Sequence, residues 1–238
     1  MKLKKIASLM LAGIMAVSML TACGNTVSEK PEDPTDEPTV TPSSSNAQMM
    51  VDNMSKDAQN KVSAVANSDL TAALQSAVED YFTNADVVKY GSWFEIVDTA
   101  YGRGPNDARD TDIGEALVSN LGAYDNEITH LNNIGAKTDS FTVVEVYGVN
   151  GSVSDKDLLE QIGHKIDSEI VALQTEATRQ DNKQENVKQY IDYDYEVSAS
   201  IVTADGRVWG IEDTVKFVAV AVTRTGEIVT SLNNPAVF

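Results

Sequence analysis

The stretch Gln189-Tyr-Ile-Asp-Tyr-Asp-Tyr-Glu-Val197 alternates apolar and polar side chains with a period of two. This alternation predicts a β-strand with one buried face and one wet face. The run Phe217 to Val222 is almost wholly apolar, as in a central strand, and Asp205-Gly206 between the two runs is a typical hairpin signal. Thr225-Gly226 offers a further turn before Ile228. We therefore expect the C-terminal part of the chain to form an antiparallel meander.

Upstream of this meander, the apolar residues recur mostly at helical spacing. The spacing and the Ser, Asp and Gly residues at its ends predict four helices, over about 50–65, 68–82, 112–131 and 154–177, and two strands, over 86–101 and 141–149. Helices that come early and strands that come late favour an α+β domain. We expect helices packed on one face of a mainly antiparallel sheet that could include parallel pairs.

The N-terminus has the pattern of an export signal. Lys2, Lys4 and Lys5 precede an apolar run over 6–20, which is too short for a membrane span and ends in small residues. The sequence Leu20-Thr21-Ala22-Cys23 resembles the lipobox of bacterial lipoproteins. The resemblance implies that residues 1–22 are a signal peptide, that Cys23 is the lipid attachment site, and that the chain is exported and held on the outer face of a bacterial membrane.

A polar segment separates this signal from the apolar remainder of the chain. Residues 24–46 contain Pro31, Pro34, Pro38 and Pro42 among Thr, Ser, Glu and Asp, and such a composition does not bury enough apolar surface to fold. We interpret 23–46 as a lipid-anchored linker that could hold the domain several nanometres from the bilayer, and 47–238 as a single globular domain.

Charge and cysteine content exclude several partners and chemistries. The net charge is −18, and the three lysines of the predicted signal make the mature chain more acidic still, near −21. Such a surface repels both the phosphate backbone of nucleic acid and anionic lipid headgroups. We therefore expect no nucleic-acid partner, and membrane contact through lipidated Cys23 rather than through a basic patch. Cys23 is the only cysteine, which leaves no thiol for a disulfide or for catalysis once it is lipidated. No cofactor is predicted.

The loop over 101–112 is the most distinctive polar segment. Asp107, Asp110 and Asp112 could bind a ligand or Ca²⁺ through their carboxylates, together with Arg109 as a candidate site residue. The spacing fails as an EF-hand, because Glu115 stands where that loop needs glycine, and arginine would compete with a cation. We favour an interpretation in which these aspartates cap the following helix and pair with arginine, and we predict no metal site.

Three acids lie at alternate positions of the predicted strand. Asp192, Asp194 and Glu196 could serve as paired acids or bind a cation, but the wet face of an amphipathic strand explains them more simply. The same reasoning assigns four aromatic residues to the core, namely Tyr193, Tyr195, Trp93 and Trp209.

The two histidines and the known short motifs give no stronger signal. His164 shares a helix face with Glu160 and Asp167, and His130 lies near the end of a predicted helix, but no H-E-x-x-H accompanies either. Nucleophile elbows, Walker loops and dinucleotide fingerprints are absent from the sequence.

These observations favour a non-enzymatic module, displayed on the cell envelope, that binds a protein, a glycan or a small ligand. Two alternatives stay open at this point. One is an envelope hydrolase, for example one that acts on glycan, that uses paired carboxylates such as Asp107, Asp110, Asp192 or Glu196. The other is an adhesion domain stabilised by Ca²⁺.

Overall fold

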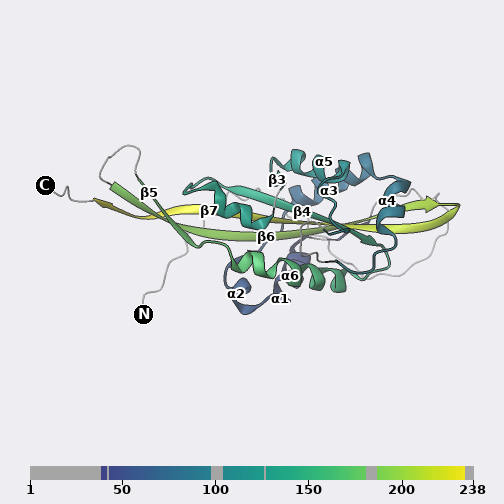
Figure 1. Cartoon of the computed structure of the whole chain (residues 1–238), viewed down its shortest axis with the longest axis horizontal. Helices are drawn as coiled ribbons and strands as arrows, with labels where there is room; N and C mark the ends of the chain where they lie inside the picture. Colours follow the sequence, from purple (N-terminus) through teal and green to yellow (C-terminus); the bar gives the residue numbers. More distant parts are fainter. Residues whose placement is uncertain (1–38, 42, 98–103, 126, 181–186, 234–238) are drawn as a thin grey trace, which may run out of the picture. The chain divides into compact units, whose positions relative to one another are not determined.

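Two long strands, β6 (Val187–Val208) and β7 (Ile211–Asn233), form an antiparallel hairpin that runs through the domain (Figure 1). The structure is a computed structural model, and it describes residues 39–41, 43–97, 104–125, 127–180 and 187–233. The predicted signal peptide, the lipobox and Cys23 lie outside the described residues.

The hairpin is the centre of a seven-stranded mixed sheet. Along the main path the order is β1-β6-β7-β4-β3, while β2 and β5 also pair with β6. β2 runs parallel to β6, β3 runs parallel to β4, and the other pairs are antiparallel. The remaining strands are β1 (Thr39–Thr41), β2 (Val62–Ala64), β3 (Tyr124–Asp125), β4 (Phe141–Asn150) and β5 (Glu176–Gln180).

Strand β1 sets the direction in which the chain enters the domain. Thr39 lies opposite Thr203 and Thr41 lies opposite Ile201 in the antiparallel register with β6. Because β6 runs on from Thr203 to the hairpin turn after Val208, the N-terminal end of β1 points toward that turn.

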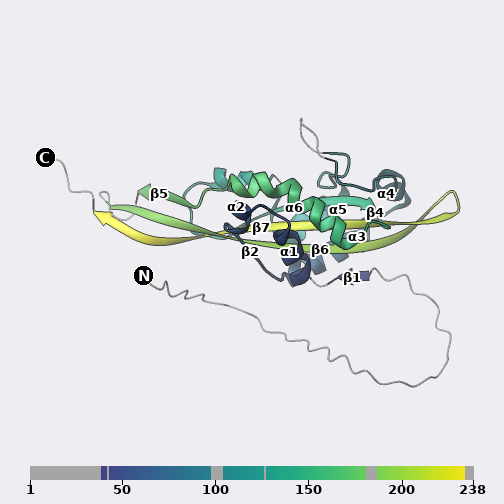
Figure 2. The same ribbon diagram turned by 90° about the horizontal axis from the view of Figure 1, so that it is seen from below.

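Helices cover both faces of the sheet (Figures 1 and 2). One face packs against α1, α2, α6 and the 3-10 helix η1, and the other packs against α3, α4 and α5. Their bounds are α1 Ser43–Asp52, α2 Lys56–Gln59, α3 Ser68–Tyr81, α4 Asn84–Tyr90, α5 Asp112–Leu121, η1 Ile128–Ile134 and α6 Asp155–Val171.

The predicted class, α+β with a mainly antiparallel, mixed sheet, is confirmed. The helices differ from the expectation in that they flank the sheet on two faces rather than on one. The physical reason is the composition of the central strands, where neighbouring residues such as Val143 and Val144, or Val220 and Ala221, are both buried on opposite faces.

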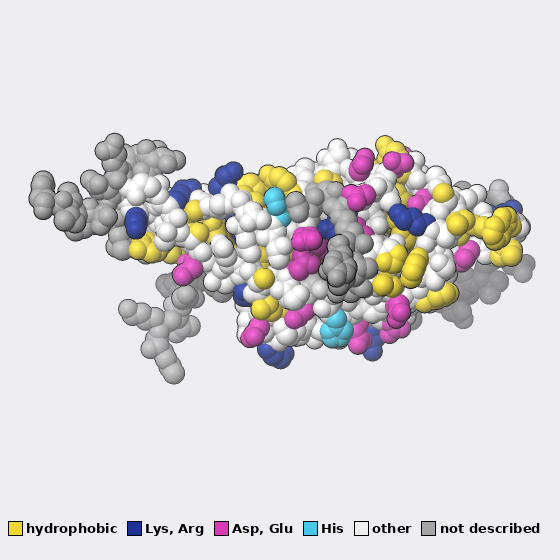
Figure 3. Space-filling view, in the orientation of Figure 1, with side chains coloured by type: hydrophobic (Ala, Val, Ile, Leu, Met, Phe, Trp, Pro, Cys, Tyr) yellow, Lys and Arg dark blue, Asp and Glu magenta, His cyan; other side chains and the backbone are white. Residues whose placement is uncertain are grey.

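The hairpin turn lies four residues beyond the predicted Asp205-Gly206. Trp209 and Gly210 form it, with φ of 50° and 81°, between the paired residues Val208 and Ile211. Hydrophobic side chains gather at this end of the molecule (Figure 3).

The second predicted turn, at Thr225-Gly226, is wrong, because β7 continues there. A Cβ on Gly226 would lie 2.6 Å from the Lys137 carbonyl oxygen, so this glycine permits a close approach instead.

Several helix boundaries also differ from the predicted ones. The segment predicted as one helix over 50–65 is two helices and a strand, because Ser55 caps a new helix and Val62–Ala64 pairs with β6. Where a strand was predicted from residue 86, the capping box of Thr83 and Asp86 starts α4; residues 98–101 of that prediction lie outside the described ranges.

The third and fourth helices end earlier than predicted. Gly122, with φ of 59°, ends α5 at Leu121, and the apolar spacing continues into η1. Helix α6 is capped by Ser154 as predicted but ends at Val171, and the last part of the predicted range belongs to β5.

The domain also begins upstream of the predicted boundary. Strand β1 and the first residues of α1 lie within 23–46, the range interpreted as linker. Asn46 is buried and Ala47 is fully covered, so this end of α1 belongs to the packed structure. The composition of this range, rich in Ser, Thr and Pro, did not indicate a strand, because β1 is only three residues long.

The contact between α1 and α6 depends on Gly163. A Cβ there would lie 2.6 Å from the carbonyl oxygen of Met50. We expect Gly163→Ala to lower the free energy of unfolding by about 1–3 kcal/mol, although alanine favours helix formation over glycine. Urea unfolding measures this change. Ser168→Ala, on an exposed position of the same helix, is the control and should cause no loss; an equally stable Gly163→Ala variant would contradict the close packing.

Candidate functional site

The candidate loop over 104–111 lies along the edge of β4. The Ala108 N–H donates to the Val146 carbonyl at 2.9 Å, and the Gly148 N–H donates to the Asn106 carbonyl at 2.8 Å. Asp107 forms an isolated bridge with Tyr147. The loop therefore extends the sheet past the short strand β3, and this pairing fixes the positions of the side chains that follow.

The inner part of the loop contributes to a buried cluster of charged groups. Arg109 is 5% exposed and pairs with Asp107, with 2.5 Å between Nη2 and Oδ2. Its Nη1 lies 3.5 Å from Oε1 of Glu145, which is 2% exposed on β4. The Tyr147 hydroxyl donates to Oε2 of the same carboxylate. The four side chains of this cluster, from the loop and from β4, thus satisfy one another inside the domain.

Burial raises the pKa of two acids, one within this cluster and one beside it. It raises the pKa of Glu145, and the nearby Arg109 charge and the Tyr147 hydrogen bond only partly offset that effect. Burial, followed by the charges of Glu145 and Glu127, raises the pKa of Glu169 on α6 to about 7. The Ile128 N–H donates to the Glu169 carboxylate at 3.0 Å, so this side chain also holds the start of η1.

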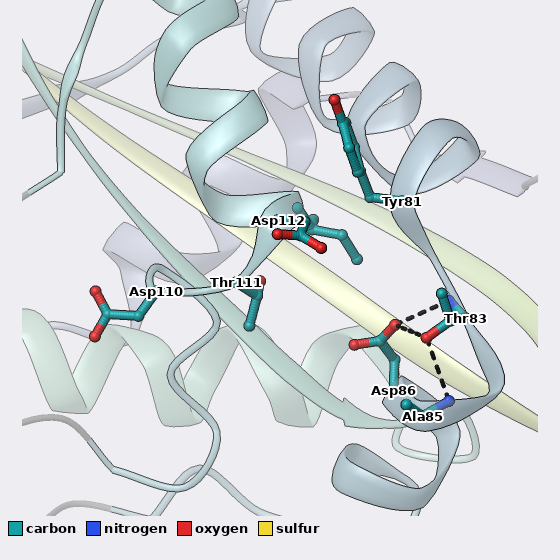
Figure 4. A pocket seen from close by; sticks show the side chains of 8 residues that line it. Tyr81, Thr83, Ala85, Asp86, Asp110, Thr111 and Asp112 are labelled. Carbon is teal, nitrogen blue, oxygen red and sulfur yellow. Dashed lines mark hydrogen bonds between the residues drawn. The ribbon is translucent and has the colours of Figure 1, made fainter.

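The outer part of the loop lines a pocket of about 280 Å³ (Figure 4). Thr111 and Asp112 lie across it from the junction of α3 and α4, and the Asp110 carboxylate points away from Thr83 and Asp86. The lining is completed by Tyr81, Thr83, Ala85, Asp86 and Ile113. Thr111, rather than Asp112, caps α5 by accepting from the Gly114 N–H, and Asp86 accepts from Thr83 in the capping box of α4. Helix capping accounts for the polar groups that Figure 4 shows bonded.

The four predicted loop residues therefore lie in two different places. Asp107 and Arg109 pair within the buried cluster, whereas Asp110 and Asp112 are exposed at the pocket. Among the described residues, no group of three or more His, Cys, Asp and Glu side chains is placed to hold a metal ion. The ion pair between Asp107 and Arg109 matches the interpretation of the loop as a structural element.

The acids of β6 do not converge on a site. Asp192, Asp194 and Glu196 are all exposed, while Tyr193 and Tyr195 between them are buried in the core. This is the wet face and dry face of an amphipathic strand. Asp107 forms an ion pair with Arg109. These residues therefore do not supply the pair of carboxylates that the hydrolase hypothesis requires.

The histidines lie apart at the surface. His164 is 66% exposed and its Nε2 lies 4.0 Å from Oε1 of Glu160, one helical turn before it. His130 is half-buried in η1, with its ring 5.9 Å from that of Tyr124. Neither arrangement resembles a set of metal ligands.

Trp209 was predicted to lie in the core, and this prediction is wrong. It is 95% exposed at the hairpin turn, and Ile211 beside it is 69% exposed. Arg207 and Glu212 flank the turn and pair at 2.6 Å. Trp93, in contrast, is half-buried, and its carbonyl accepts from the Asn150 N–H. The sequence signal for the hairpin turn, and so for an exposed Trp209, was the Trp209-Gly210 dipeptide, because glycine after a run of alternating residues favours a turn.

Comparison with known proteins gives no match to a protein-family model, to a curated protein or to a solved structure. In the part of the chain that the structure describes, no helix is both long enough and apolar enough to cross a bilayer.

The buried cluster predicts a large effect for Arg109. We expect Arg109→Met to lower the free energy of unfolding by about 3–5 kcal/mol, because Glu145 and Asp107 would both lose their buried cation. Adding Glu145→Gln should recover part of the loss, since it removes one of these two carboxylates. Urea unfolding of both variants measures this coupling. Arg207→Met, which removes an exposed ion pair, is the control and should cost less than about 1 kcal/mol; equal losses for both arginines would refute the assignment.

Glu169 predicts a pH dependence with a defined sign. Because its folded pKa is raised, the native state binds the proton more tightly than the unfolded chain, so this group makes the domain less stable as pH rises from about 5 toward 8. We expect Glu169→Gln to reduce that decline, by on the order of 1 kcal/mol after solvent screening, relative to wild type. Urea unfolding at both pH values gives the difference. The charged groups around it, Glu145, Glu127 and Lys165, stay in both proteins; parallel pH profiles would show that Glu169 does not titrate in this range.

Proposed function

We propose that this chain is a bacterial envelope lipoprotein, tethered through Cys23, whose domain is a non-enzymatic interaction module. Residues 207–212, which we call the tip, are the proposed contact element. The observation that carries the proposal is the exposed Trp209 in a backbone conformation that tryptophan rarely adopts.

Local physical chemistry argues against tryptophan at this place. Positive φ at both central residues of a two-residue hairpin is typical of a type I′ turn, in which Asn-Gly is strongly preferred. An L-residue other than glycine, asparagine or aspartate loses roughly 1–2 kcal/mol there. Burial does not repay this loss, since the side chain is 95% exposed. Strained residues of this kind mark candidate functional positions, and tryptophan is enriched among residues that dominate binding.

The rest of the domain supports the tip as a fixed element. Strands β6 and β7 stay paired up to Val208 and Ile211. The side chain of Asn84, at the start of α4, accepts from the Arg207 N–H at 2.9 Å, and Gly206 lies against Val87 of the same helix. A turn whose backbone is held in this way loses little backbone conformational entropy on binding.

The tether rests on the sequence. The basic start, the short apolar run and Leu20-Thr21-Ala22-Cys23 agree with a lipoprotein signal. The lipid would keep the domain at a membrane surface, where a contact element such as the tip meets envelope components.

Labelling of the full chain in a bacterium tests the proposal. With a clickable fatty acid in the medium, we expect the wild-type chain to be labelled and to sediment with membranes, whereas Cys23→Ser should lose both properties. A benzophenone amino acid at position 209 should give photo-adducts with envelope components, and the same group at Val229, an exposed apolar residue near the other end of the hairpin, is the control. Labelling that survives Cys23→Ser would refute the tether, and adducts at 229 but not at 209 would refute the tip as contact element.

A further inference from the structure

We propose that the tip inserts into the headgroup region of the same bilayer that holds the lipid anchor, so that the domain docks on the membrane through Trp209 and Ile211. This inference rests on the proposed tether at Cys23 and names the partner of the tip. It follows from the chemistry of the tip, from the direction of β1 and from the effect of a tether on a weak contact.

The tip has the composition of a membrane-interface element. Trp209 and Ile211 are 95% and 69% exposed, and the charges of Arg207 and Glu212 cancel in their ion pair. An indole ring has an apolar body and a single polar N–H, which is why tryptophan collects at the boundary between lipid headgroups and acyl chains. A turn with this composition can enter that boundary without burying an uncompensated charge.

The register of β1 fixes the side from which the chain enters the domain. Thr39 pairs with Thr203 and Thr41 with Ile201, so the N-terminal end of β1 points toward the turn and the chain enters β1 from the tip side. The tip lies about 20 Å beyond Thr203, at about 3.3 Å for each strand residue. Residues 24–38 can span at most about 50 Å when extended, so the tether is long enough for the tip to reach the bilayer.

A tether makes a weak contact sufficient. Two exposed side chains would give the free domain only marginal affinity for lipid. Once the domain is anchored, insertion of the tip becomes an intramolecular event with an effective concentration near the millimolar range. The lipid therefore supplies the proximity, and the tip supplies the orientation.

The size and charge of the surface favour a membrane over a protein partner. A stable protein interface takes about 800 Å² from each partner, and the two apolar side chains of a narrow turn offer no more than about half of that. A bilayer needs no complementary shape. The net charge of −18 also predicts that the tip enters zwitterionic lipid better than anionic lipid, because an anionic surface repels the domain.

Fluorescence of the lipidated full chain in phosphatidylcholine vesicles tests the inference. In a Trp93→Phe background Trp209 is the remaining tryptophan, since the chain has two. We expect its emission to shift to shorter wavelength on reconstitution, and phosphatidylcholine brominated near the headgroup to quench it at least about twofold more strongly than phosphatidylcholine brominated deep in the acyl chain. A fraction of anionic lipid should weaken this quenching.

Matched variants separate insertion from folding. Ile211→Ser should reduce the quenching at least about twofold, whereas Val229→Ser, which removes an exposed apolar side chain near the opposite end, should leave it unchanged. Trp209→Asn, with Trp93 retained, should be no less stable to urea than wild type, because asparagine suits the turn, and its remaining tryptophan should not be quenched. A destabilised Trp209→Asn variant would contradict the strain at the turn.

The outcomes distinguish the two proposals. If the protein floats with the vesicles but Trp209 is not quenched, the tether stands and insertion of the tip is refuted. If the purified chain carries no lipid and does not float with the vesicles, the tether fails and the docked arrangement fails with it. Photo-adducts at position 209 that contain protein rather than lipid, in cells that carry the lipidated chain, would also overturn insertion and leave the interaction module intact.

Discussion

Continuous pairing between β6 and β7 is the constraint on which the rest of the structure depends. Their register extends from Val187 opposite Asn233 to Val208 opposite Ile211, with one shift near Ile191. Every other strand except β3 pairs directly with one of these two, and both sets of helices pack on faces that the hairpin provides. The ladder satisfies the backbone groups of this segment, so its twist and length decide where helices can pack and how far the turn projects.

The periodicity of the sequence predicted much of this arrangement. Alternation over 189–197 and the apolar run over 217–222 identified the two central strands, and the serine at 154 identified the start of α6. That apolar run also held the information that helices cover both faces, because a strand buried on two sides has no reason to alternate. The turn was misplaced because Asp-Gly is a local preference, whereas strands end where pairing and packing end. Here β6 stays paired with β7 through Gly206, and α4 contacts both Gly206 and the Arg207 N–H.

The candidate site was predictable only where its contacts are local. The pair of Asp107 and Arg109 is two residues apart and could be inferred from the loop itself. Glu145 joins them from β4, and nothing near it in the sequence indicates which cation it meets. An acid within Val-Val-Glu-Val-Tyr, an otherwise apolar strand, was nevertheless a sign that a buried partner must exist. Trp209 was missed because aromatic residues are usually buried, and exposure depends on a turn whose position is set by the whole sheet.

Residues that depart from local preference in this domain are of two kinds: buried charged residues with internal partners, and an exposed residue without one. Glu145 is compensated by Arg109 and Tyr147. Arg224, 1% exposed, donates to the Leu131 and Gly135 carbonyls and lies over the Tyr193 ring, and these contacts hold η1 on the sheet. Such groups serve the fold, because the contacts that repay their burial are internal. Trp209 combines an unfavourable φ with an exposed side chain, and no contact within the described residues offsets that combination. A departure without internal compensation is explained by a contact outside the chain, which is why the tip, rather than the charged loop, is the better guide to what this domain does.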